Sequence, residues 1–186
     1  MLTTIFFVIV FALSANVPAQ DNMKRWSKEH PITIDDFKGL PSLVETRFPK
    51  GVFNDIPAAY LATLISIETR YATNYWEVSV MNEMDRNLSF VNDTTVKYWL
   101  QHEQIHFNIN EVYTRKIRRA VEILQKRNER NIDVYNNVID LKLSKLDSVH
   151  YQFDFETGFG VNISNQNRWE RKIQDLLIEL EEFADE

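Results

Sequence analysis

Cysteine is absent from the chain, and glycine and proline are scarce, with 4 and 5 residues among 186. The absence of cysteine excludes disulfide bonds, thiolate metal ligands and a cysteine nucleophile. The scarcity of glycine and proline argues against collagen-like and Gly-rich linker sequences. The apolar run at residues 5–13 is also well short of the roughly 20 residues that a membrane-spanning helix needs.

The remaining composition is that of an ordinary globular protein. Hydrophobic residues make up 44% and charged residues 26% of the chain, and the length indicates a single domain. Aromatic residues, at 12%, are numerous enough to build a sizeable core. The net charge of −6 and the pI of about 5.3 argue against nucleic acid or anionic lipid as the main partner.

The first 19 residues predict export. They contain no Asp, Glu, Lys or Arg, and the apolar run is followed by Val17-Pro18-Ala19, which places small residues before a cleavage site after Ala19. Lys or Arg normally precedes such a run and none does here, so the alternatives are an uncleaved membrane anchor and a buried helix. We expect residues 1–19 to be a signal peptide and 20–186 to be one domain in a bacterial periplasm or outside the cell, with no membrane span after cleavage.

The periodicity of apolar residues changes from two to about 3.6 near the middle of the chain. Alternation predicts strands at 58–69 and 75–84 and a short third strand at 88–91, and the second strand offers an edge to an extended peptide. A long helix to about residue 127 is expected to follow, capped by Asp93, Thr94 or Thr95. Further helices are predicted at about 132–155, ended by Gly158 and Gly160, and at 165–183. The fold class is therefore α+β, with a small antiparallel or mixed N-terminal sheet followed by three helices.

The long helix contains the pattern His-Glu-x-x-His from His102 to His106. Residues i and i+4 lie on one helix face, so both imidazoles can reach one metal ion, and Glu103 lies beside them where it can take a proton from water. This composition gives about 0.007 such matches by chance, so the pattern indicates a site. The alternative is a pair of buried histidines satisfied by hydrogen bonds alone.

A third ligand is needed, and spacing leaves three candidates. His150 and Asp154 share one face of the second helix, whereas Glu156 points elsewhere while the helix persists. The short connection at 128–131 predicts antiparallel helices, which returns this region towards His102. Two neutral imidazoles, a carboxylate and no thiolate favour Zn²⁺ as the cofactor.

Several segments resemble a family of exported bacterial proteins described as secreted zinc-dependent proteases. The segments that carry the resemblance are the turn Asp35-Asp36-Phe37-Lys38-Gly39-Leu40-Pro41, the HEQIHF stretch from His102 to Phe107, the segment from Phe153 to Gly160, Gln166 and Trp169. The resemblance spans most of the chain after the signal peptide. Three positions depart from the family pattern: Ile34 stands where a Trp is usual, Phe153 replaces a Tyr, and Phe159 replaces a His.

The resemblance implies a zincin-like metallopeptidase domain. In this reading His102, His106 and Asp154 hold one catalytic Zn²⁺, and Glu103 is the general base that acts on a peptide or protein substrate. Asp154 is retained from the family pattern, and His150 is the local substitute if Asp154 is not the ligand. Because Phe159 replaces a His, a catalytically impaired zinc- or peptide-binding module is the alternative function, and a purely structural or interaction protein is a third.

Overall fold

The computed structural model describes residues 22–41, 58–95 and 98–185. The predicted signal peptide lies outside these ranges, as do residues 42–57. Within them, no helix is long and apolar enough to cross a membrane.

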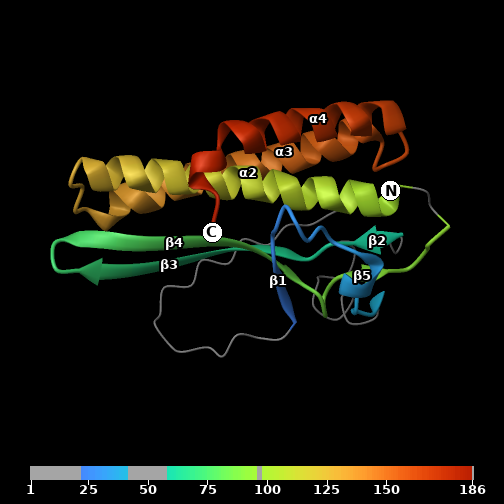
Figure 1. Cartoon of the computed structure of the whole chain (residues 1–186), viewed down its shortest axis with the longest axis horizontal. Helices are drawn as coiled ribbons and strands as arrows, with labels where there is room; N and C mark the ends of the chain where they lie inside the picture. The colour runs from blue at the N-terminus through green and yellow to red at the C-terminus, as the bar shows by residue number, and fades with distance from the viewer. Residues whose placement is uncertain (1–21, 42–57, 96–97, 186) are drawn as a thin grey trace.

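The described residues form an α+β fold, as predicted, in which a small antiparallel sheet precedes three helices. In chain order the elements are β1 (Met23–Arg25), the 3-10 helix η1 (Ile34–Asp36), β2 (Ala59–Tyr60), β3 (Thr63–Ala72), β4 (Tyr75–Asp85), β5 (Phe90–Val91), α2 (Trp99–Lys126), α3 (Ile132–Thr157), α4 (Ile163–Glu179) and the 3-10 helix η2 (Glu181–Phe183). The long β3–β4 hairpin forms one layer, and α2 lies between it and the other two helices (Figure 1).

The strand predicted at 58–69 is two strands. β2 pairs with β5, whereas β3 pairs with β4 along its whole length, from Thr63 opposite Met84 to Ala72 opposite Tyr75. Alternation continues across the break because Leu61 is buried between the two strands. The hydrophobic pattern therefore does not show where the strand changes its partner.

β4 is the central strand of its sheet, in the order β1-β4-β3. Its Val80 carbonyl accepts hydrogen bonds from Arg118, and its Trp76 carbonyl accepts one from Gln125. β1 covers only Glu83–Asp85 of β4, so the edge at residues 75–81 has no strand beside it within the described residues, and peptide binding there stays a prediction. Within the described residues, the opposite edge of this sheet, along β3, also pairs with no further strand.

α2 begins later than predicted. Asp93 Oδ1 accepts a hydrogen bond from the Thr95 backbone, which makes a turn before the helix rather than a cap on it. The residue before the helix is Tyr98, which has a left-handed backbone (φ 65°) and no side-chain capping bond. The prediction of Asp93, Thr94 or Thr95 as the N-cap is thus wrong because the local Asp-Thr bond competes with helix initiation.

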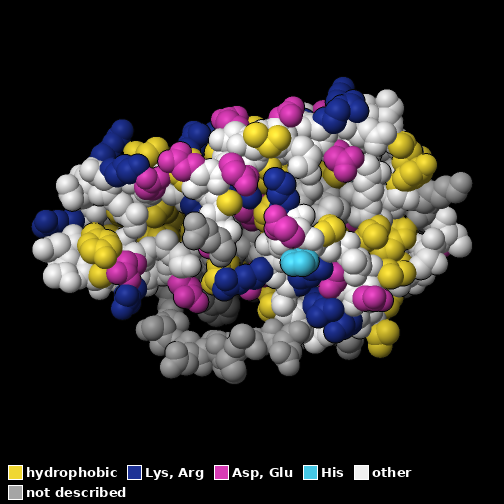
Figure 2. Space-filling view, in the orientation of Figure 1, with side chains coloured by type: hydrophobic (Ala, Val, Ile, Leu, Met, Phe, Trp, Pro, Cys, Tyr) yellow, Lys and Arg dark blue, Asp and Glu magenta, His cyan; other side chains and the backbone are white. Residues whose placement is uncertain are grey.

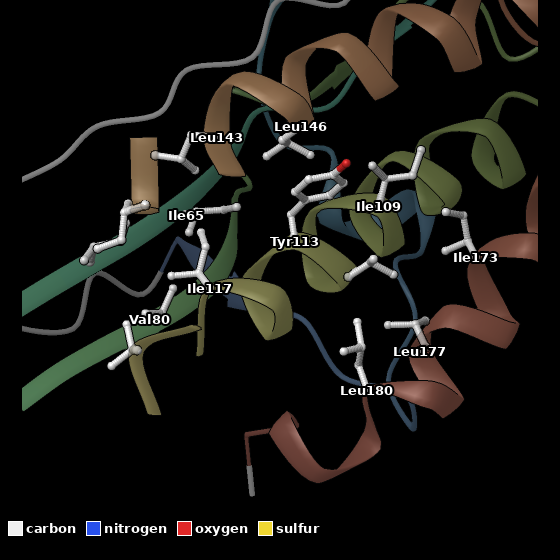
Figure 3. Close-up of a cluster of buried hydrophobic side chains, with 14 of the residues drawn as sticks. Ile65, Val80, Ile109, Tyr113, Ile117, Leu143, Leu146, Ile173, Leu177 and Leu180 are labelled. Carbon is white, nitrogen blue, oxygen red and sulfur yellow. The ribbon is translucent and has the colours of Figure 1, made fainter. Parts of the chain in front are cut away.

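α2 is the centre of the core, because sheet, α3 and α4 all pack against it. Every residue from 105 to 115 is buried. Figure 3 shows apolar side chains from α2, such as Ile109 and Ile117, between Ile65 and Val80 of the hairpin and the leucines of α3 and α4. Polar residues of α2 that are buried in this position need hydrogen-bond partners within the protein.

The turn from Asp36 to Pro41 joins the N-terminal segment to the sheet. Asp36 forms ion pairs with Lys24 at 2.7 Å and Arg86 at 3.2 Å. The Gly39 N–H donates to the Ser89 carbonyl, and a Cβ on Gly39 would lie 2.6 Å from the Asn87 carbonyl oxygen. Only glycine allows this approach, so the turn that contributes to the family resemblance has a structural role here.

α3 and α4 position the C-terminal half of the chain around α2. α3 runs antiparallel to α2 after a short connection and ends, as predicted, at Gly158, which has a left-handed backbone (φ 57°). α4 ends four residues before the predicted end at 183, and η2 follows it. On the face shown in Figure 2, acidic and basic side chains are intermixed rather than gathered by sign.

Candidate metal centre

Three potential ligand atoms converge where α2 and α3 lie side by side. His102 Nε2 is 3.1 Å and His106 Nε2 is 2.9 Å from Asp154 Oδ1, and the two Nε2 atoms are 3.1 Å apart. All three residues are buried, with at most 5% of their surface exposed. This group could hold a metal ion.

The spacing of the three atoms suits a small tetrahedral ion. Zinc bonds of about 2.0–2.1 Å place neighbouring ligand atoms roughly 3.3 Å apart. The separations here, 2.9 to 3.1 Å, are slightly shorter, so a small outward movement of the side chains would accommodate the ion. Helical geometry supplies the two histidines, and the antiparallel packing of α3 supplies the carboxylate.

The other two candidates for the third ligand lie outside this group. His150 Nδ1 is 2.9 Å from His106 Nδ1, the ring nitrogen that does not face Asp154. Glu156 accepts hydrogen bonds from Gln152, Arg168 and Trp169, on the side of α3 that faces α4 and solvent. Among the three residues that spacing left open, only Asp154 joins His102 and His106.

Gln166 of α4 orients His102. Its Oε1 lies 3.3 Å from His102 Nδ1, and its amide nitrogen donates to the Tyr98 carbonyl and to Gln101 Oε1. Because the amide group is held by two acceptors, its oxygen is presented to His102. The Nδ1 proton of His102 then points to Gln166, and Nε2 points to Asp154.

Aromatic rings and a glycine enclose the two imidazoles. Phe153 stacks on His102 at a centroid distance of 4.6 Å and meets His106 edge-on at 4.7 Å. Gly160 also lies against His102, where an added Cβ would be 3.3 Å from the ring carbon Cγ. Phe159 has a left-handed backbone (φ 57°), and its N–H donates to the Asp154 carbonyl at the end of α3.

The charges of the site favour an ionised Asp154. Burial by itself raises the pKa of this carboxyl, but the charge of His106 and hydrogen bonds from both histidines hold it well below its usual range. For His150, burial and the neighbouring His106 lower the pKa well below the ordinary value. An anionic carboxylate beside two imidazole nitrogens is a suitable environment for a divalent cation.

Glu103 is buried beside this group without a complete set of partners. Only 3% of the residue is exposed, and its Oε2 makes no hydrogen bond within the described part of the chain. Burial and the charge of Asp154 raise its pKa to about 7, although His102 opposes the shift. Burial, together with Glu103, likewise raises the pKa of Tyr60 from β2. An unpartnered carboxylate oxygen at this place is able to accept a proton from a water molecule.

Sequence reasoning did not assign roles to two residues that support the histidines. Gln166 was visible as part of the family resemblance, but its contact with His102 depends on where α4 packs. Asn110, four residues beyond His106, accepts from His150 at 2.8 Å. Its position on the same helix face was the only signal in the sequence.

Comparison with known proteins adds no relative. No family model matches the chain, and neither curated proteins nor solved structures give a match. The resemblance to secreted zinc-dependent proteases therefore stays a prediction.

Proposed function

We propose that this protein is a zinc-dependent hydrolase, most simply a peptidase, with a zincin-like domain. The observation that carries the proposal is the convergence of His102 Nε2, His106 Nε2 and Asp154 Oδ1 beside the unpartnered Oε2 of Glu103. Three protein ligands that leave one position open are typical of catalytic rather than structural zinc.

The ligand set supports the choice of metal. Two neutral imidazoles and one carboxylate suit Zn²⁺, and no cysteine is present to favour a softer ion. The three groups leave a net charge of about +1 on the site, and a bound Zn²⁺ supplies a Lewis acid that makes water more acidic.

In this mechanism His102, His106 and Asp154 would hold the cation, and Glu103 would act as the general base. Its burial raises the pKa above that of an exposed glutamate, which favours uptake of a proton from the attacking water. The protonated Glu103 then donates the proton to the leaving amine. The peptide substrate and the location outside the cytoplasm follow from the family resemblance and from residues 1–19, and they belong to the same proposal.

A second candidate function is a metal-binding module without catalysis. The observation that favours it is the burial of the three ligands, because substrate must reach a catalytic metal. Phe159, where the zinc-protease pattern carries a His, points the same way, since it puts an apolar residue next to Gly160, which lies against His102.

Metal analysis combined with one substitution tests the proposal. The purified protein should contain about one zinc per chain, and Glu103→Gln should keep the zinc and lose hydrolysis of unfolded protein substrates. Glu156→Gln is the matched control, because it makes the same change on a carboxylate directed away from the site. Zinc without cleavage by the wild type would favour the second function, and absence of bound metal would contradict both.

A further inference from the structure

His106 is linked to the sheet by a chain of buried polar groups. Its Nδ1 lies 2.9 Å from His150 Nδ1, and His150 Nε2 lies 2.8 Å from Asn110 Oδ1. The Asn110 amide nitrogen donates to Thr63 Oγ1 at 2.6 Å. All four residues are buried, with at most 8% of their surface exposed, so water does not compete for these groups.

The hydrogen bonds that join these four side chains can be donated in one direction only. Asn110 donates to Thr63, which turns its amide oxygen towards His150. His150 must therefore donate from Nε2, and as a neutral imidazole it carries no proton on Nδ1. His106 must then donate from its own Nδ1 to His150.

This order decides which nitrogen of His106 can bind a cation. With Nδ1–H committed to His150, the remaining nitrogen is Nε2, which faces Asp154 Oδ1 at 2.9 Å. A cation that enters the site exchanges for a proton at Nε2 and leaves Nδ1 unchanged. In the reverse order Nδ1 would carry no proton, so a cation at Nε2 would have to displace the only proton of the ring and leave an imidazolate, which opposes metal binding.

We infer that Thr63, Asn110 and His150 are positioning residues that hold the Nδ1 proton of His106 and so make Nε2 its metal-binding nitrogen. The inference rests on the metal site proposed above. It assigns His150 a role other than that of a ligand, and it connects the first residue of β3 to the site.

The sharpest test replaces His150 by residues that differ in hydrogen bonding. The side chain in His150→Gln can still accept from His106 and donate to Asn110, so its Zn²⁺ affinity should stay within a few-fold of wild type. His150→Leu lacks both groups and should weaken Zn²⁺ binding about 10- to 100-fold, the usual effect of losing a partner of a metal ligand. Equal losses in the two variants, or wild-type affinity in His150→Leu, would overturn the inference.

Thr63→Val tests the residue of this hydrogen-bonded series that lies furthest from the metal ligands. It removes the acceptor that orients Asn110, and we expect a measurable loss of Zn²⁺ affinity. Thr114→Val is the control, because Thr114 is also buried, on α2, but its hydroxyl makes no hydrogen bond within the described residues. An equal effect of the two substitutions would contradict the role of Thr63.

Nuclear magnetic resonance of the ¹⁵N-labelled wild type reads the hydrogen bond directly. We expect a protonated His106 Nδ1 with a scalar coupling across the hydrogen bond to His150 Nδ1, both without metal and with Zn²⁺ added. An unprotonated Nδ1 would refute the inference. Because the metal-free spectrum is sufficient, failure of the inference is distinguishable from failure of the protein to bind zinc.

Discussion

Asp154→Asn removes the negative charge of the third ligand and keeps the shape of its side chain. Asp154 Oδ1 lies 2.9 and 3.1 Å from the two histidine nitrogens, and the amide would keep an oxygen there but lose the negative charge. Glu156→Gln is a control on the same helix, two residues further along. Its carboxylate already bonds to Gln152, Arg168 and Trp169 and does not face the site.

The size of the effect follows from the role of the residue. Loss of a group that only supports a ligand costs about 10- to 100-fold in metal affinity, so loss of an anionic ligand should cost at least about 100-fold. At a Zn²⁺ concentration of 100 times the wild-type Kd, binding stabilises the wild type by about 2.7 kcal/mol. Asp154→Asn would then gain only about 0.4 kcal/mol at the same concentration.

Thermal unfolding with and without Zn²⁺ measures this difference. For a chain of this length, about 2.7 kcal/mol corresponds to a Tm increase of roughly 5–11 °C, whereas about 0.4 kcal/mol gives roughly 1–2 °C. Glu156→Gln should show the wild-type increase. A full increase in Asp154→Asn would refute the assignment of this carboxylate to the metal.

Two further predictions concern residues around the site and the sheet. Gly160→Ala adds a Cβ 3.3 Å from the His102 ring, at a residue with φ +86°, and should weaken Zn²⁺ binding in a titration. Gly158→Ala should leave the affinity unchanged, because its added Cβ has no atom within 4 Å. Asp36→Asn should lower the free energy of unfolding by about 1–3 kcal/mol at neutral pH, because it breaks the buried ion pair with Lys24. The Asp36 pKa is lowered in the folded state despite its burial, so its contribution is complete above about pH 4 and is lost as the pH falls through the folded pKa. Urea unfolding from pH 3 to 7 should show the two proteins converging at the acid end, and a constant difference would contradict this account.

Local patterns in the sequence were sufficient for the helices and for part of the site. The 3.6-residue periodicity predicted α3 to within two residues, and the i, i+4 spacing placed His102 and His106 on one face. Both results depend on backbone geometry within one element, which is nearly the same in every helix. The strand that became β4 was predicted for the same reason, since its alternation is uninterrupted.

Tertiary structure decided which strands pair and which side chains of α3 contact α2. Alternation does not record that β2 and β3 pair with different strands, and the Asp93–Thr95 hydrogen bond moved the start of α2 to Trp99. The sequence could not choose among Asp154, His150 and Glu156 as the third ligand. The distance of each side chain from α2 depends on how α3 is rotated and packed. The packing of α3 directs Asp154 to both histidines and His150 to the opposite nitrogen of one of them. The sequence by itself therefore determined the two histidines and their glutamate, whereas the choice of carboxylate arose from contacts between helices, which no spacing along the chain encodes.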